Sequence, residues 1–142
     1  DRKLVKTFSS VSKNLDMEHV LIVHGDDGLD EITVSSETVI CELKNNKIRE
    51  YKISPKDFGI NISPFEEIIA HSSEESLMLV KDAFSGKSSA VQDMIALNSG
   101  AALYVADIVK SISDGVEMAF ELMNNGKAAN KLETYVKAST NI

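Results

Sequence analysis

The chain of 142 residues contains few of the residues on which common functional sites depend. Its single cysteine, Cys41, excludes an internal disulfide and a Cys-x-x-Cys metal or redox pair, and its apolar neighbours indicate a small buried side chain. No apolar run reaches the roughly 18 residues typical of a membrane span, and the first residues lack the apolar stretch of a secretory signal. We therefore expect a cytoplasmic protein that does not bind membranes.

Basic residues are also scarce, since 15 lysines and arginines stand against 22 aspartates and glutamates and give a formal net charge of −7. No basic tract reverses this balance, and a negative protein is repelled by a phosphate backbone. We therefore expect no nucleic-acid partner. The length and the 43% hydrophobic content are sufficient for the core of one domain, so we expect residues 1–142 to form one domain or part of one.

The seven glycines do not form a phosphate-binding loop, because they make neither G-x-G-x-x-G nor G-x-x-x-x-G-K-[ST]. The backbone N–H groups that cradle a diphosphate would therefore have to come from another segment. The glycines are Gly25, Gly28, Gly59, Gly86, Gly100, Gly115 and Gly126.

The apolar pattern of the N-terminal half predicts an α/β fold. Residues 1–15 carry apolar side chains at helical spacing and predict an amphipathic helix capped by Asp1 or a neighbour. The continuous apolar run 19–23 predicts a strand covered on both faces, as in a parallel sheet. Residues 38–53 predict a β-hairpin that turns at Asn45-Asn46, because asparagine tolerates the positive φ of a two-residue turn. The register then pairs Leu43 with Ile48, Glu42 with Arg49 and Ile40 with Tyr51.

The C-terminal half is expected to be helical. Serine–proline pairs predict two short helices with Ser54 and Ser63 as N-caps. The most apolar segment, 89–109, predicts a central helix in which packing and a buried hydrogen bond suffice to explain Asn98 and Tyr104. Further helices are predicted from Ser72 or Ser73 to Gly86, with Leu77, Val80 and Phe84 inward, and on both sides of Gly126, with Ser111 or Ser113 as the first cap.

An acidic loop follows the strand at 19–23, where VHGDDGLDEIT places four carboxylates within six positions. One interpretation is a solvated turn that bends at Gly28. The other is a ligand site, because ligands of open α/β sheets bind beyond the carboxyl ends of strands and loop carboxylates are suitable ligands for Mg²⁺. An EF-hand does not fit, since the alternating acids and the closing glutamate are absent. The four acids are Asp26, Asp27, Asp30 and Glu31.

Three stretches resemble the C-terminal part of bacterial anthranilate phosphoribosyltransferase: VLIVHGDDGLDEIT, ICELKNNKIREYKISPKDFGI and the segment from ALNSGAALYVADIVK to KLETYV. The resemblance implies a truncated phosphoribosyltransferase catalytic domain. Its activity would be the transfer of the phosphoribosyl group of PRPP to the amine of anthranilate in tryptophan biosynthesis. The resemblance also implies that Asp30 and Glu31, in the motif GLDE, bind the Mg²⁺ that accompanies the PRPP diphosphate.

Other parts of the family pattern have no counterpart here, namely the GTGGD phosphate loop, the KHGN segment, an arginine that helps hold anthranilate and the N-terminal helical domain through which dimers form. We therefore expect the isolated chain to be inactive, with an exposed sheet edge that favours self-association. His24 and the neighbouring residues to Gly28 are expected to shape the loop, although His24 has two interpretations, substrate contact or a bond to local backbone.

Three alternative functions remain open. A non-catalytic relative that binds nucleic acid would have a basic surface and a degraded acidic motif, whereas this chain is acidic and keeps GLDE. A free-standing protein-interaction domain would need only the fold. A nucleoside phosphorylase is possible by analogy of fold, but GLDE argues against it.

Overall fold

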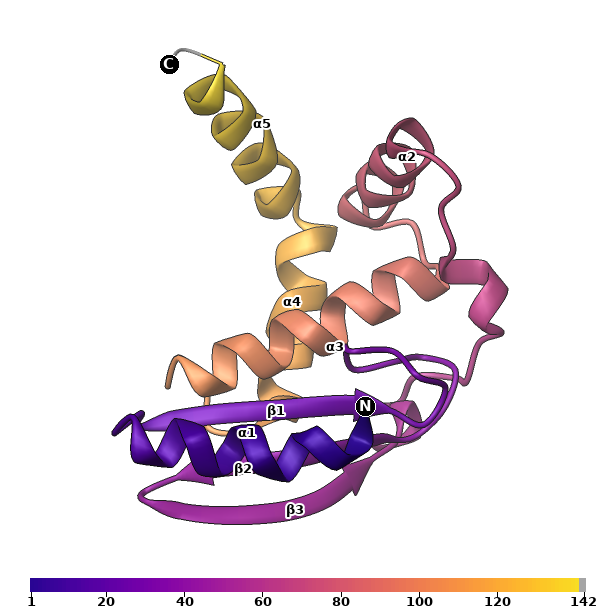
Figure 1. Ribbon diagram of the computed structural model, residues 1–142. Coiled ribbons are helices and arrows are strands. Elements are labelled where there is room, and N and C mark those ends of the chain that lie inside the picture. The colour runs from indigo at the N-terminus through magenta and orange to yellow at the C-terminus, as the bar shows by residue number, and fades with distance from the viewer. Residues whose placement is uncertain (141–142) are drawn as a thin grey trace.

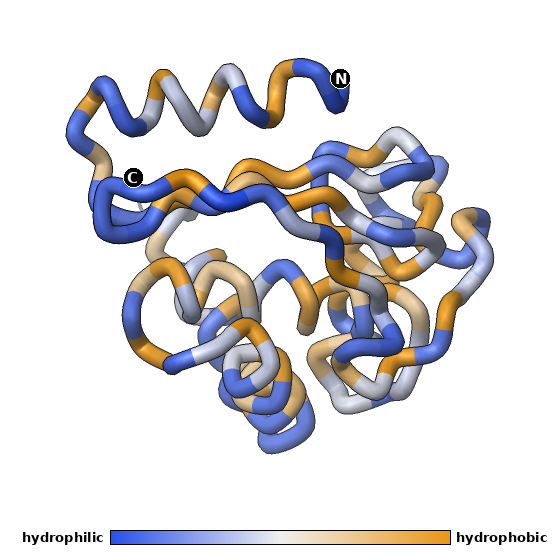
Figure 2. The backbone as a smooth tube through the Cα atoms, turned by 90° about the horizontal axis from the view of Figure 1, so that it is seen from below, coloured by the Kyte–Doolittle hydropathy of each residue, from blue (hydrophilic) through white to orange (hydrophobic). Residues whose placement is uncertain are grey.

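The computed structural model describes residues 1–140 and has three layers. A sheet of three strands, β1 (His19–Gly25), β2 (Thr38–Lys44) and β3 (Lys47–Ile53), forms the middle layer. Helix α1 (Arg2–Asn14) lies on one face of this sheet, and the C-terminal helices lie on the other (Figures 1 and 2). The predicted α/β fold with a strand, a hairpin and a helical C-terminal half is therefore confirmed, while the last two residues of the expected 1–142 domain lie outside the described range.

The strand order is β1-β2-β3, and both pairs are antiparallel. The expectation of a parallel-sheet strand at 19–23 is wrong for the described residues, where β1 pairs only with β2 and is half-buried from His19 to His24. A continuous apolar run indicates that both faces are covered, but it does not determine the direction of the neighbouring strand. The direction follows here from the connecting loop, which brings the chain back alongside β1 at Thr38.

The hairpin of β2 and β3 is confirmed in position and register. Asn45 and Asn46 have φ values of 50° and 59°, which suit a two-residue turn between twisted strands. The three predicted cross-strand pairs are present. A turn formed by two adjacent residues is determined locally, which explains why the sequence predicts it well.

Helix α1 is capped as predicted, since the Asp1 side chain accepts a hydrogen bond of 2.9 Å from the Lys3 N–H. Its apolar stripe does not face the sheet, however. The helix buries Val5, Ser9 and Ser12 instead, and the Ser9 hydroxyl lies 3.2 Å from the Cys41 carbonyl of β2. Small side chains allow the helix to lie close to the sheet. The exposed stripe comprises Leu4, Phe8, Val11 and Leu15, which are 45–69% exposed.

The remaining helices have serine caps near the predicted positions. Ser72, Ser89 and Ser111 each accept a hydrogen bond from the backbone at the start of a helix. These helices are α2 (Ser73–Phe84), α3 (Ala90–Val105) and α4 (Ile112–Asn124), and two 3-10 turns, η1 (Pro55–Phe58) and η2 (Phe65–Ile68), precede them, while α5 (Lys127–Ser139) follows Gly126. No helix among residues 1–140 combines the length and apolarity that crossing a membrane requires.

Three details differ from the sequence expectations. The turn η2 begins at Phe65 and has Pro64, not Ser63, as its N-cap. In η1, by contrast, the serine is the N-cap and the proline is the first residue of the turn. Helix α3 ends at Val105, which leaves Ile108 in the following turn and 61% exposed. Leu77, expected inward, is 47% exposed because α2 lies at the edge of the helical layer (Figure 1).

Helices α3 and α4 cross at two glycines. A Cβ atom placed on Gly100 would lie 2.5 Å from the Val116 nitrogen, and one placed on Gly115 would collide with the Gly100 carbonyl. The two backbones are therefore in contact, and this crossing holds α4 against the central helix. The adjoining core includes Ile40, Leu97, Ala101, Val116 and Met123.

Candidate functional site

Of the four carboxylates in the acidic loop between β1 and β2, two have partners within the fold and two do not. Asp26 forms an ion pair with Lys52 of β3 at 2.6 Å, and the same ammonium lies 2.7 Å from Glu37. The hydrogen bond from Lys52 holds the pKa of Asp26 below its usual value, and the two carboxylates raise the pKa of Lys52. The charge of Asp26 is thus compensated within the fold.

Asp27 points into the loop and joins its two ends. The Thr33 and Ser35 hydroxyls donate to one carboxylate oxygen, and the Leu29 N–H donates to the other at 3.1 Å. Burial raises the pKa of Asp27, but these hydrogen bonds outweigh burial and leave the pKa below its usual value. Asp27 is therefore a structural acceptor. Gly28 permits the bend beside it, with a φ of 101° that other residues rarely adopt.

His24 makes the contact with local backbone that was one of its two interpretations. Its Nδ1 lies 3.0 Å from the Leu29 carbonyl, which accepts the hydrogen bond when that nitrogen carries the proton. The Gly25 N–H donates to the same carbonyl at 2.9 Å. His24 therefore shapes the loop through a local backbone contact.

Asp30 and Glu31 are the two acids of this loop that have no compensating partner among the described residues. Both are exposed, and within residues 1–140 neither carboxylate has a hydrogen bond or an ion pair. No group of three His, Cys, Asp or Glu side chains is placed to hold a metal in this part of the chain. The pair nevertheless fits Mg²⁺, which is usually bound by one or two carboxylates and completes its octahedron with water and phosphate oxygens.

The residue after this pair is tightly held. Ile32 is 2% exposed, and its N–H and C=O both form hydrogen bonds with the Asn98 side chain of α3, at 2.9 and 2.8 Å. The buried hydrogen bond expected for Asn98 is thus present, but its partner could not be predicted because it lies 66 positions away.

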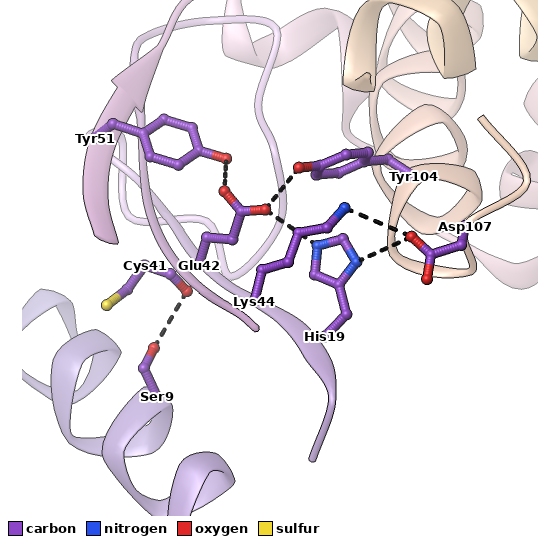
Figure 3. Close-up of polar contacts among 8 residues, drawn as sticks. All are labelled: Ser9, His19, Cys41, Glu42, Lys44, Tyr51, Tyr104 and Asp107. Carbon is purple, nitrogen blue, oxygen red and sulfur yellow. Dashed lines mark hydrogen bonds and ion pairs between the residues drawn. The ribbon is translucent and has the colours of Figure 1, made fainter. Parts of the chain in front are cut away.

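A second polar cluster lies at the opposite end of β1 and centres on Glu42 (Figure 3). This buried carboxylate accepts hydrogen bonds from Tyr104 at 2.8 Å and Tyr51 at 3.2 Å, and its other contact is His19 Nε2 at 3.1 Å. Burial and the neighbouring Glu42 raise the pKa values of both tyrosines. The sequence identified Glu42 only as the partner of Arg49 across the ladder. Polar contacts from three different elements therefore surround this buried carboxylate, as a buried polar group requires.

Proteins similar in sequence to this chain include several anthranilate phosphoribosyltransferases. Residues 1–129 match the family described as "Glycosyl transferase family, a/b domain". The anthranilate phosphoribosyltransferase of Vesicomyosocius okutanii subsp. Calyptogena okutanii (strain HA) is 40% identical over 139 residues, which are 98% of this chain and 41% of that protein. The one of Marinomonas sp. (strain MWYL1) is 44% identical over 133 residues, 92% of this chain and 38% of that protein. The chain thus spans about two fifths of these relatives.

Solved structures with the same fold carry the same name. The crystal structure of anthranilate phosphoribosyltransferase from Thermus thermophilus has a TM-score of 0.87 at 27% identity and covers 96% of this chain and 40% of that one. The enzyme from Saccharomyces cerevisiae in complex with PRPP and Mg has a TM-score of 0.87 at 18% identity, a likeness of fold that covers 100% of this chain and 41% of that one. The family resemblance predicted from the motifs is therefore confirmed, and the chain belongs to the glycosyl transferase family, a/b domain.

Proposed function

We propose that the chain is the C-terminal part of the catalytic domain of an anthranilate phosphoribosyltransferase and contributes Asp30 and Glu31 as ligands of the Mg²⁺ that accompanies PRPP. The observation that carries the proposal is the separation of the four loop acids. Asp26 and Asp27 are compensated by Lys52 and by hydroxyl groups, whereas Asp30 and Glu31 remain exposed and available to a cation. Family membership and relatives with this name give further support.

The proposed chemistry needs a positive group that stabilises the negative charge of the leaving diphosphate. When diphosphate leaves C1 of the ribose, negative charge grows on its oxygens, and Mg²⁺ stabilises that charge as a Lewis acid when it is bound. Asp30 and Glu31 hold the ion at the loop, and neither has to move a proton. Asp27 keeps the loop folded under the repulsion of its neighbours, since its hydrogen bonds join the start of the loop to Thr33 and Ser35.

The phosphate cradle and the anthranilate site are proposed to come from residues outside this chain. The seven glycines form no phosphate-binding motif, and backbone N–H groups are the donors that a diphosphate needs. The isolated chain is therefore proposed to be inactive. The complete protein is proposed to act as a homodimer on PRPP and anthranilate.

A chimera tests the proposal. The chain replaces the matching segment of the 40% identical Vesicomyosocius enzyme, and anthranilate fluorescence is followed with PRPP and Mg²⁺. We expect consumption of anthranilate by the chimera and none by the chain alone. The double substitution Asp30→Asn, Glu31→Gln should lower the rate on the order of 100-fold, as for loss of other groups that stabilise transition-state charge.

The matched control is Glu66→Gln, Glu67→Gln, which neutralises another adjacent pair of exposed acids in η2 and should leave the rate unchanged. Full activity after neutralisation of Asp30 and Glu31 would refute their assignment. Turnover by the chain alone would refute the proposed origin of the phosphate site. A folded but inactive chimera would favour a non-catalytic relative of the family.

A further inference from the structure

Asp30 and Glu31 form a two-residue span between two fixed points. On one side, the Leu29 N–H donates to Asp27 at 3.1 Å, and the Leu29 carbonyl accepts from the Gly25 N–H at 2.9 Å. On the other side, the Ile32 side chain is in the core. Within the described residues, the backbones of Asp30 and Glu31 form no hydrogen bond of their own. Their positions are therefore set by Leu29 and Ile32.

Asn98 fixes the second of these points to α3. Its side-chain oxygen accepts from the Ile32 N–H at 2.9 Å, and its side-chain nitrogen donates to the Ile32 carbonyl at 2.8 Å. One amide side chain thus pairs both polar groups of a single residue, as a neighbouring strand would. The same nitrogen lies 2.9 Å from the Met94 carbonyl one turn earlier, which fixes the orientation of the amide.

The surroundings of this contact offer Ile32 little alternative. Asn98 lines two cavities, and the one that it shares with Glu31 is otherwise bordered mainly by apolar side chains such as Ile68, Met94 and Ile95. Without Asn98, the Ile32 N–H and C=O would have to bind water or remain unpaired, and an unpaired polar group is unfavourable in a buried position. We expect the loop to move towards solvent instead, and this movement would carry Glu31 with it.

We propose that Asn98 is a positioning residue for the Asp30–Glu31 pair: its double hydrogen bond to Ile32 fixes the carboxylates relative to α3. The proposal rests on the metal role given above to Asp30 and Glu31. Asn98 touches neither carboxylate and acts only through the backbone of Ile32. Groups that orient metal ligands from outside the coordination shell typically change metal affinity by roughly 10-fold to 100-fold when they are removed.

Two measurements test the proposal. The first is amide hydrogen exchange in the chain itself, where the Ile32 amide should be protected and the Asp30 and Glu31 amides should exchange fast. The second is Mn²⁺ binding, as a spectroscopic substitute for Mg²⁺, to the chimera with PRPP present. Asn98→Ala should remove the protection of Ile32 and weaken Mn²⁺ binding on the order of 10-fold. Asn98→Leu removes the same hydrogen bonds but nearly keeps the volume of the side chain. It should have the same effect, and it separates loss of the hydrogen bonds from loss of packing.

The control is Ser99→Ala, the neighbouring half-buried position, which should change neither measurement. Unchanged Mn²⁺ affinity in both Asn98 variants would overturn the role of Asn98 but not the metal role of Asp30 and Glu31. The metal site would then not depend on the hydrogen bonds between Asn98 and Ile32. Fast exchange of the Ile32 amide in the unsubstituted chain would also overturn it. Mn²⁺ binding that persists after Asp30→Asn, Glu31→Gln would overturn the metal assignment, and this inference with it.

Discussion

Substitution of Gly100 by alanine tests the backbone contact that holds α4 on the central helix. The new Cβ would lie 2.5 Å from the Val116 nitrogen and 2.9 Å from the Gly115 carbonyl carbon, whereas ordinary contacts begin near 3.4 Å. The helices must therefore separate by about 0.9 Å, because a backbone atom cannot rotate away as a side chain can. Overpacking of this kind costs roughly 1–3 kcal/mol, and we expect the upper end.

A gain in helix propensity opposes this cost. Alanine is better than glycine in a helix by about 1 kcal/mol, so the net loss should be about 2 kcal/mol. Urea unfolding followed by circular dichroism measures it, and the midpoint should fall by about 1 M at an m-value near 2 kcal/mol/M. Ser99→Ala, at the next position of α3, should shift stability by less than about 0.5 kcal/mol. Gly100→Ala with equal or higher stability than the unsubstituted chain would refute the close crossing.

Three further predictions concern pH and association. Hydrogen bonds lower the pKa of Asp27 in the folded chain below its value of 3.8 in the unfolded chain. The stabilisation from ionised Asp27 is therefore present above pH 3.8 and is lost as the pH falls through the folded pKa. Asp27→Asn should make the free energy of unfolding, measured with urea, less dependent on pH below about pH 4. The pKa of Tyr51 is raised in the folded chain, so the stabilisation from its neutral hydroxyl is present below the unfolded pKa of 10.0 and is lost as the pH rises through the folded pKa. Tyr51→Phe should therefore reduce the loss of stability at alkaline pH. An equally steep loss of stability in this variant would contradict the prediction. The exposed stripe of α1 should make the isolated chain self-associate, and Phe8→Lys should shift its sedimentation towards the monomer; a monomeric unsubstituted chain would disprove this.

Features determined by neighbours in the chain were predictable from the sequence. The hairpin turn depends on Asn45 and Asn46, and most helix starts depend on a serine followed at once by the helix. The buried side of α1 was not predictable, because it depends on how closely the helix can approach β2. Ser9 is in this contact, while the larger Phe8 remains outside it.

The candidate site divides in the same way. The sequence shows four acids together, and family resemblance selects Asp30 and Glu31. The sequence does not show that Lys52 forms an ion pair with Asp26, because the two residues are 26 positions apart. Asn98 is still more distant from Ile32, and its role depends on the packing of α3 beside the loop. The compensated and uncompensated acids are therefore distinguished only in the folded chain.

The most direct test of the central claim is to locate the bound ion by paramagnetic broadening. Mn²⁺ is added to the chimera with PRPP, and the loss of amide NMR signals is mapped along residues 1–140. We predict that broadening is strongest at Asp30 and Glu31 and decreases with distance from the loop, so that it is weakest in α5, which points away from the loop (Figure 1). Broadening centred on any other acids, or none at the loop while PRPP is bound, would contradict this prediction.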